Sequence, residues 1–118
     1  MNASITPSDV ISSDKVEGTN VYNIAGEKLG SIDDLMIDKR SGQVQYAVLE
    51  FGGFLGMGTD RYPLPWSMLK YDTDKDGYVV PLDKDRLDKA PHYALDEAPA
   101  YTPEYGTEVN RYYDQRGF

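Results

Sequence analysis

Cysteine is absent from this 118-residue chain, and histidine occurs only once. The missing thiols exclude disulfide bonds, thiolate zinc sites and cysteine nucleophiles together. His92 lies between Pro91 and Tyr93, and the sequence contains no G-x-S-x-G motif that would place a reactive serine beside it. We therefore interpret His92 as an exposed connector residue and the acid pairs at 33–34 and within 83–88 as surface carboxylates. The chain is predicted not to be an enzyme.

Long apolar runs and basic clusters are also missing. No apolar run approaches the roughly 20 residues needed to cross a bilayer, and the first residues, MNASITPSDVISS, lack the basic start and apolar stretch of a secretory signal. The net charge is −8, and the longest basic run is Lys39-Arg40, whereas nucleic-acid binders group their lysines and arginines. We therefore expect no nucleic-acid partner, no membrane insertion and a cytoplasmic location.

Short apolar runs separated by turn residues occupy positions 16–82. This spacing is typical of a small β-barrel or sandwich formed by a single domain. Residues 43–51 alternate well enough to predict a strand. A further strand is expected over 59–66, but Pro63 and Pro65 cannot donate to a ladder, so this strand should be very short or lie at an edge.

The stretch DTDKDGYVVPLD, residues 72–83, matches much of the calcium-loop template. Its aspartates fall at the first, third, fifth and last positions, and calcium favours such rings of oxygen ligands. However, the last position is normally the longer Glu, the letters GYVV favour a strand, and no second loop is present. We prefer an Asp-Gly hairpin turn between two strands. The alternative is a calcium-binding protein that uses Asp72, Asp74, Asp76 and Asp83.

Four glycines frame the segment GGFLGMG, residues 52–58. A phosphate cradle would require a following helix, whereas Thr59 and Asp60 lead into an expected strand. One hypothesis is that the glycines carry an adaptable apolar contact patch, and the alternative is a loop tucked into the core. The contact residues would be Phe54, Leu55 and Met57.

The end of the chain, residues 91–118, contains half of the ten tyrosines. A helix is predicted over about 103–115, with Thr102 as its N-cap and Pro103 in its first turn. A disordered tail would not carry this much aromatic area, so we expect the segment to pack on the strands or on a second copy. Large amphipathic rings often anchor interfaces, and the candidate contact residues here are Tyr101, Tyr105, Tyr112 and Tyr113.

The pieces LGSID, DLMID, YAVLEFGG, FLGMG and PLPWSML follow one another in this order. In this combination the chain resembles the PRC-barrel family, named for the photosynthetic reaction centre, over about residues 15–90, and it looks like a stand-alone bacterial member. The resemblance implies a mainly β fold: a small, strongly bent antiparallel β-barrel with a short C-terminal helix. Residues 1–14 would form a flexible N-terminal arm, and residues 91–118 an aromatic-rich extension.

The resemblance also implies docking rather than chemistry. In the reaction-centre H subunit the barrel caps a membrane complex, and in a ribosome-maturation factor it contacts a ribosomal protein. We therefore expect a non-enzymatic protein-binding or assembly module without a cofactor, calcium being the alternative. Its partners would be other proteins and a second copy of the chain, with a homodimer as the expected form.

Overall fold

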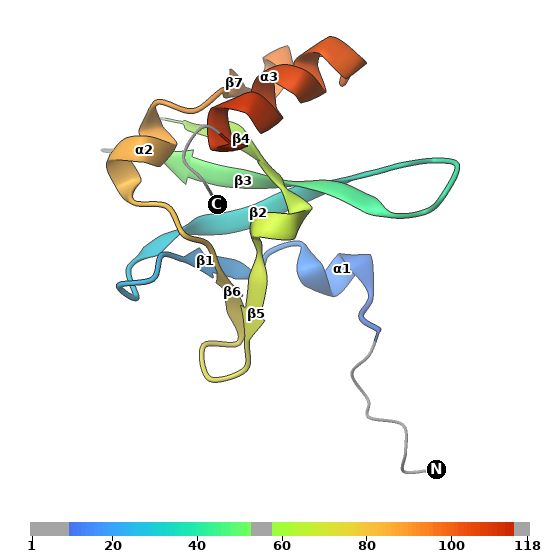
Figure 1. Cartoon of the computed structure of the whole chain (residues 1–118). Helices are drawn as coiled ribbons and strands as arrows, with labels where there is room; N and C mark the ends of the chain where they lie inside the picture. The colour runs from blue at the N-terminus through green and yellow to red at the C-terminus, as the bar shows by residue number, and fades with distance from the viewer. Residues whose placement is uncertain (1–9, 53–57, 115–118) are drawn as a thin grey trace, which may run out of the picture.

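The computed structural model describes residues 10–52 and 58–114. Within them, seven strands form one sheet in the spatial order β5-β6-β1-β2-β3-β4-β7 (Figure 1). The strands are β1 (Asn20–Tyr22), β2 (Lys28–Ile37), β3 (Val44–Gly52), β4 (Thr59–Pro65), β5 (Lys70–Asp72), β6 (Gly77–Val79) and β7 (Tyr93–Ala94). The helices are α1 (Ser13–Val16), α2 (Lys84–Asp88) and α3 (Pro103–Asp114), with short 3-10 helices at η2 (Trp66–Met68) and η3 (Leu95–Glu97).

The longest strands, β2, β3 and β4, form an antiparallel meander at the centre of the sheet. Alternation along β3 places Ala47 and Leu49 in the core, where their partners on β4, Leu64 and Tyr62, are also buried. β2 pairs with β3 through two register irregularities. Because bulges increase the twist of a strand pair, the β2–β3 hairpin extends from the body as a twisted ribbon (Figure 1).

The sheet is open, so the expected antiparallel barrel is not confirmed. Its outer strands, β5 and β7, do not pair with each other in the described part of the chain. β1 and β6 also run parallel, so the sheet is not wholly antiparallel. The outer strands have only three and two residues, and the helix α3 packs against β4 beyond the short β7 (Figure 1). The expectation of a mainly β fold with a C-terminal helix is confirmed.

β4 is seven residues long and pairs with β3 along its whole length, so it is longer than its two prolines indicated. On its other side, β7 pairs only with Asp60 and Arg61. Pro63 and Pro65 therefore lie where β4 has no second strand partner among the described residues. Their missing N–H groups cost no ladder bond on that side.

α3 covers one side of the core. Thr102 accepts a hydrogen bond from the backbone N–H of Tyr105 at 3.1 Å, as expected of an N-cap. Val109 and Tyr113 lie one helical turn apart and are 0% and 1% exposed, in one cluster with the buried residues of the sheet. The described part of the aromatic extension therefore packs on the strands of its own chain.

At the other end of the chain, α1 begins after Ser12, whose hydroxyl accepts a hydrogen bond from the N–H of Asp14. Its last residue, Val16, is buried in the core. Ser13 and Asp14 thus belong to a helical turn, while residues 1–9 of the predicted arm lie outside the described residues. In the described ranges, no helix is both long enough and apolar enough to cross a membrane.

Candidate interaction surfaces

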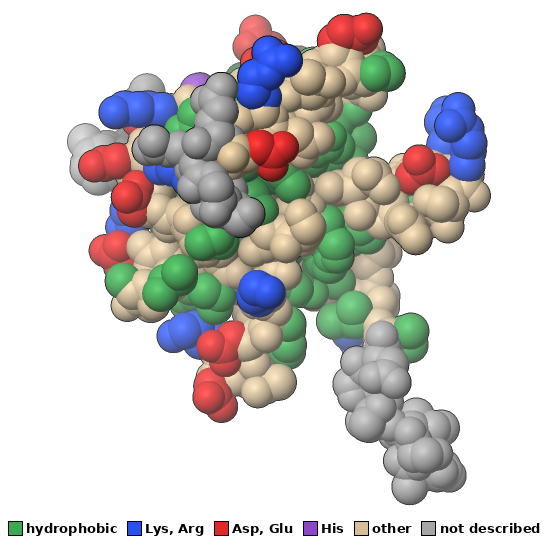
Figure 2. All heavy atoms as spheres, viewed as in Figure 1, with side chains coloured by type: hydrophobic (Ala, Val, Ile, Leu, Met, Phe, Trp, Pro, Cys, Tyr) green, Lys and Arg blue, Asp and Glu red, His purple; other side chains and the backbone are tan. Residues whose placement is uncertain are grey.

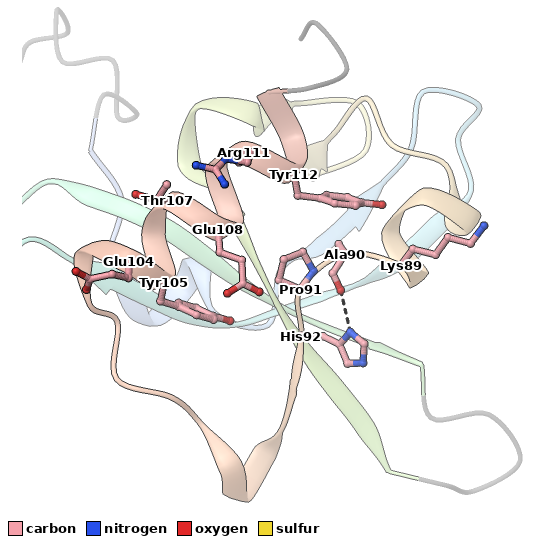
Figure 3. A pocket seen from close by; sticks show the side chains of 10 residues that line it. All are labelled: Lys89, Ala90, Pro91, His92, Glu104, Tyr105, Thr107, Glu108, Arg111 and Tyr112. Carbon is pink, nitrogen blue, oxygen red and sulfur yellow. Dashed lines mark hydrogen bonds between the residues drawn. The ribbon is translucent and has the colours of Figure 1, made fainter.

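A groove of about 590 Å³ separates α3 from the connector that follows α2 (Figure 3). One wall comes from the connector, residues 89–92, and the other from exposed or half-exposed side chains of α3. Both charge signs occur on the walls, beside apolar and aromatic surface. The lining residues are Lys89, Ala90, Pro91, His92, Glu104, Tyr105, Thr107, Glu108, Arg111 and Tyr112.

His92 fixes the connector wall of this groove. Its Nδ1 atom lies 2.8 Å from the carbonyl oxygen of Ala90, and its Nε2 atom lies 3.5 Å from Oδ2 of Asp60. The imidazole ring stacks on the ring of Tyr62, with the two centroids 4.8 Å apart. Both ring nitrogens therefore face oxygen atoms of the chain, and the side chain ties the connector to β4.

Arg86 of α2 holds the C-terminal end of α3. Its guanidinium donates to the carbonyl oxygens of Tyr112 and Tyr113 at 3.3 and 3.2 Å, and in return the Tyr112 hydroxyl donates to the Arg86 carbonyl. A cation near the last carbonyls of a helix also interacts favourably with the helix dipole. These contacts fix the distance between the two walls of the groove.

The N-terminal end of α3 packs on a cluster of tyrosine rings. The hydroxyl oxygens of Tyr93 and Tyr101 lie 2.6 Å apart, and the ring of Tyr101 also contacts those of Tyr46 and Tyr105. Burial, followed by the hydrogen bond to Tyr93, raises the pKa of Tyr101. Gly106 lets the helix approach this cluster, since a Cβ atom there would lie 2.8 Å from the Tyr46 hydroxyl.

Tyr105 joins the tyrosine cluster to the groove (Figure 3). Its hydroxyl is buried and has no hydrogen-bond partner among the described residues. Burial is the main cause that raises the pKa of Tyr105 to about 12. Leaving a buried donor unpaired costs stability, so this hydroxyl is a weak point of the packing between α3 and the sheet.

Arg61 forms a second polar centre, on the face of the meander opposite Tyr62. The residue is 6% exposed, and its guanidinium contacts Asp33 at 2.9 Å and Glu50 at 3.3 Å. Its Nη1 atom donates to Oγ1 of Thr59 at 2.7 Å. This buried cation crosslinks β2, β3 and β4, and its role is to hold strands together.

The aspartate-rich stretch is a hairpin, as the preferred interpretation predicted. β5 and β6 pair antiparallel, and Asp76 adopts a φ of +50° directly before Gly77. The carboxylate of Asp72 accepts the N–H of Asp74 at 2.9 Å, whereas that of Asp83 caps α2 by accepting the N–H of Arg86 at 2.8 Å. Across the described residues, no group of three or more metal-ligating side chains is brought together.

The predicted contact residues have different positions. Phe54, Leu55 and Met57 lie outside the described residues. Tyr105 and Tyr112 line the groove, whereas Tyr101, a member of the tyrosine cluster, faces a second hollow lined by residues 36–40, 45 and 46 of the β2–β3 hairpin. The prediction of Tyr113 as a contact residue is wrong, because its side chain is 1% exposed, belongs to the core and presents no surface to a partner.

Sequence reasoning missed the connector wall and the Arg61 centre. Both depend on residues that meet only after folding: Arg61 contacts Asp33 from 28 positions away, and Arg86 contacts α3 from 26 and 27 positions away. One signal was available for Arg61, since an arginine at the centre of an apolar strand requires acidic partners. No comparable signal marked residues 89–92.

Three comparisons with known proteins bear on this architecture. An uncharacterised protein of Deinococcus radiodurans is 24% identical over 81 residues, which are 69% of this chain and 28% of that protein. The crystal structure of a putative 16S ribosomal RNA processing protein RimM from Pseudomonas aeruginosa is similar with a TM-score of 0.42 and 22% identity, over 72% of this chain and 50% of that one. The chain thus spans well under two thirds of either relative. A family model described as PRC-barrel domain matches residues 8–87, which is more than half of the sequence, and the chain therefore belongs to the PRC-barrel domain family.

Proposed function

We propose that this domain is a non-enzymatic protein-binding module, and that its partner docks in the groove between α3 and residues 89–92. The observation that carries the proposal is the groove itself, which two separate anchors hold open. Arg86 fixes one end of α3, and the Tyr93–Tyr101 hydrogen bond supports the other. Preorganised walls favour binding because less conformational entropy is lost when the partner docks.

The chemistry of the groove favours a polypeptide over a small ion. Glu104, Glu108 and Arg111 occupy exposed positions of α3, and Lys89 is an exposed residue of the connector. Half-exposed Tyr112 supplies an amphipathic ring of the type that anchors interfaces. An extended peptide with an apolar side chain between charged residues of both signs would complement these walls.

The groove lies outside the part of the chain that matches the family model, which supports a role for the groove in selecting the partner. All its lining residues come after residue 87, where the family match ends. The module common to the family therefore serves as a platform, and the extension that follows it forms the binding surface. Self-association belongs to the same proposal, with Phe54, Leu55 and Met57 as further contact candidates.

Affinity capture from the native cell tests the groove. The purified domain is compared with Glu108→Arg and Arg111→Glu, which reverse exposed charges on the groove face of α3. Glu97→Arg, at an exposed position of η3 outside the groove, is the matched control. We expect proteins retained by the wild type and the control to be lost from both groove variants, with unchanged thermal unfolding in all four.

Capture that is equal for the groove variants and the wild type would contradict the proposal. Capture of no protein by any form of the domain would contradict it as well. Light scattering on the same samples reports self-association separately, so the two parts of the proposal are judged on different measurements.

A further inference from the structure

A second hollow, of about 440 Å³, lies beside the β2–β3 hairpin and shares no lining residue with the groove. Its lining comprises residues 36–40, 45 and 46 of the hairpin together with Tyr101, which precedes α3. All of these except Tyr101 lie within residues 8–87, the part of the chain that matches the family model. The hollow therefore belongs mainly to the module itself, whereas the groove belongs to the extension.

Part of this lining is apolar and aromatic. Ile37 is 49% exposed, and the rings of Tyr46 and Tyr101 contact each other with their centroids 5.7 Å apart. The Asn110 amide donates to the Tyr46 hydroxyl at 3.5 Å. The Tyr101 hydroxyl lies 2.6 Å from that of Tyr93, so both rings are held in place before any partner binds. A fixed aromatic surface beside an exposed isoleucine favours the burial of an apolar side chain from another molecule.

The rest of the lining is mainly basic. Lys39 and Arg40 are exposed in the turn of the hairpin, and basic side chains gather at its tip in Figure 2. The turn is fixed, because the Asp38 carboxylate accepts the N–H groups of Arg40 and Ser41 at 2.8 and 3.0 Å. The same hydrogen bonds lower the pKa of Asp38, so this carboxylate is charged but already has partners. Two cations and one engaged carboxylate leave the lining with a net positive charge.

The sign of this local charge is opposite to that of the whole chain, whose net charge is −8. The hairpin extends from the body (Figure 1), and charges more than ~8 Å apart are largely screened at physiological ionic strength. An acidic group at the tip therefore interacts with Lys39 and Arg40 more strongly than with the acids of the body. A long polyanion or a second copy of the chain would also meet the acidic body and be repelled. The charges thus favour a short acidic segment.

We propose that this hollow docks a short acidic segment of a partner protein. Carboxylates of the segment contact Lys39 and Arg40. A large apolar side chain between those carboxylates packs on Ile37 and on the tyrosine rings of the hollow. The inference goes beyond the proposed function, because it assigns a second surface with a different specificity. The groove presents charges of both signs, whereas this hollow selects acids.

Selection from a phage-displayed library of random peptides tests the inference. We expect the wild-type domain to enrich peptides in which aspartates and glutamates flank a leucine or an aromatic residue. Fluorescence anisotropy with the most enriched peptide, labelled with fluorescein, then measures its affinity. Lys39→Glu, Arg40→Glu and Ile37→Ser should each weaken binding about ten-fold, and added salt should weaken binding to the wild type.

Two control variants separate this hollow from the rest of the molecule. Lys28→Glu makes the same charge change at an exposed position at the other end of β2 and should leave the affinity unchanged. Arg111→Glu, in the groove, should leave it unchanged as well. All five substitutions are at exposed positions, so thermal unfolding of every variant should match that of the wild type.

Enriched peptides without acids overturn the inference, as does a peptide that Lys28→Glu weakens as much as Lys39→Glu. Binding that Ile37→Ser leaves unchanged, or that an oligothymidylate of equal charge displaces, shows a response to charge alone and overturns it too. Self-association of the domain that Lys39→Glu abolishes would put a second copy in the hollow instead. If the only enriched peptides are lost in Arg111→Glu and retained by Lys39→Glu, the proposed function stands and this inference fails. A selection that enriches nothing overturns the inference, while capture from the native cell still judges the groove.

Discussion

A single charged residue, Arg61, organises the centre of the sheet. Its side chain crosses from β4 over β3 to β2 and contacts a carboxylate on each of these neighbouring strands, Glu50 and Asp33. Burying an arginine is unfavourable unless its donors are satisfied, and here Thr59 supplies the further acceptors. The arrangement makes the two carboxylates dependent on the cation, because without it they would face each other across β2 and β3.

Replacing this residue should reveal that dependence. Arg61→Met is expected to lower the free energy of unfolding by about 2 kcal/mol. This is less than the roughly 3–5 kcal/mol for a fully buried pair, because the partner carboxylates are 37% exposed and remain partly hydrated. Urea unfolding measures the change, and Arg111→Met at an exposed position is the control, expected to change stability by less than about 0.5 kcal/mol. Equal urea midpoints for the two variants would show that the buried ion pairs do not hold the strands together.

At the scale of single elements, the hydrogen bonds of the aspartates in and after the β5–β6 hairpin distinguish a structural turn from a calcium site. The Asp72 carboxylate already accepts a hydrogen bond from the backbone N–H of Asp74. The backbone carbonyl of Asp72 accepts another from the N–H of Lys75 at 3.2 Å. Asp83 lies beyond β6 and is committed to the N-terminus of α2. The acids thus serve two different elements and stabilise each of them locally.

Asp72→Ala is therefore expected to lower the free energy of unfolding by about 1 kcal/mol, because one side-chain acceptor in the turn is lost. The loss should be the same with and without millimolar calcium, and calorimetric titration of the wild type should give no heat of specific binding. Thermal unfolding in chelator and in calcium provides the comparison. A calcium-dependent stabilisation of the wild type that disappears in Asp72→Ala would instead support the calcium site.

Elements set by local patterns could be predicted from the sequence, and those set by distant partners could not. The alternation over 43–51, the Asp-Gly turn and the N-cap at Thr102 are properties of adjacent residues, and each appears in the structure. The parallel pairing of β1 with β6 joins segments more than 50 positions apart, and two-residue β7 has no periodicity to recognise. For the same reason, the sequence identified Tyr105 and Tyr112 on α3 but not the connector that faces them across the groove.

At the scale of the whole molecule, the C-terminal extension completes the domain. The sheet is open, and the side beyond the short β7 is occupied by α3, which buries Val109 and Tyr113 against it. The helix thereby provides part of the core and one wall of the groove. Stability and the proposed binding function are coupled through α3, so a condition that weakens its packing should also weaken capture of a partner.

Alkaline pH should weaken the packing of α3, because tyrosine side chains are buried where this helix contacts the sheet. Burial raises the pKa of Tyr62 and of Tyr105 from 10.0 to about 12, and it raises those of Tyr101 and Tyr113 in the same direction. Between pH 10 and about pH 12 these tyrosines keep their protons in the folded chain but release them in the unfolded chain. Stability should therefore be fully present below pH 10 and fall as the pH rises towards about 12.

Urea unfolding at a series of pH values, with tyrosinate absorbance recorded on the folded protein, measures this decline. Tyr62→Phe and Tyr105→Phe should each make it shallower, because each removes a group that the unfolded state ionises first. Repulsion within this acidic chain also grows with pH, but the variants retain that contribution, so the difference between the curves isolates the phenols. Tyr105→Phe should in addition lose no stability at neutral pH, since it removes a buried hydroxyl without a hydrogen-bond partner in the described part of the chain. Curves that run parallel for the wild type and both variants would mean that α3 is weakened by some other ionisation.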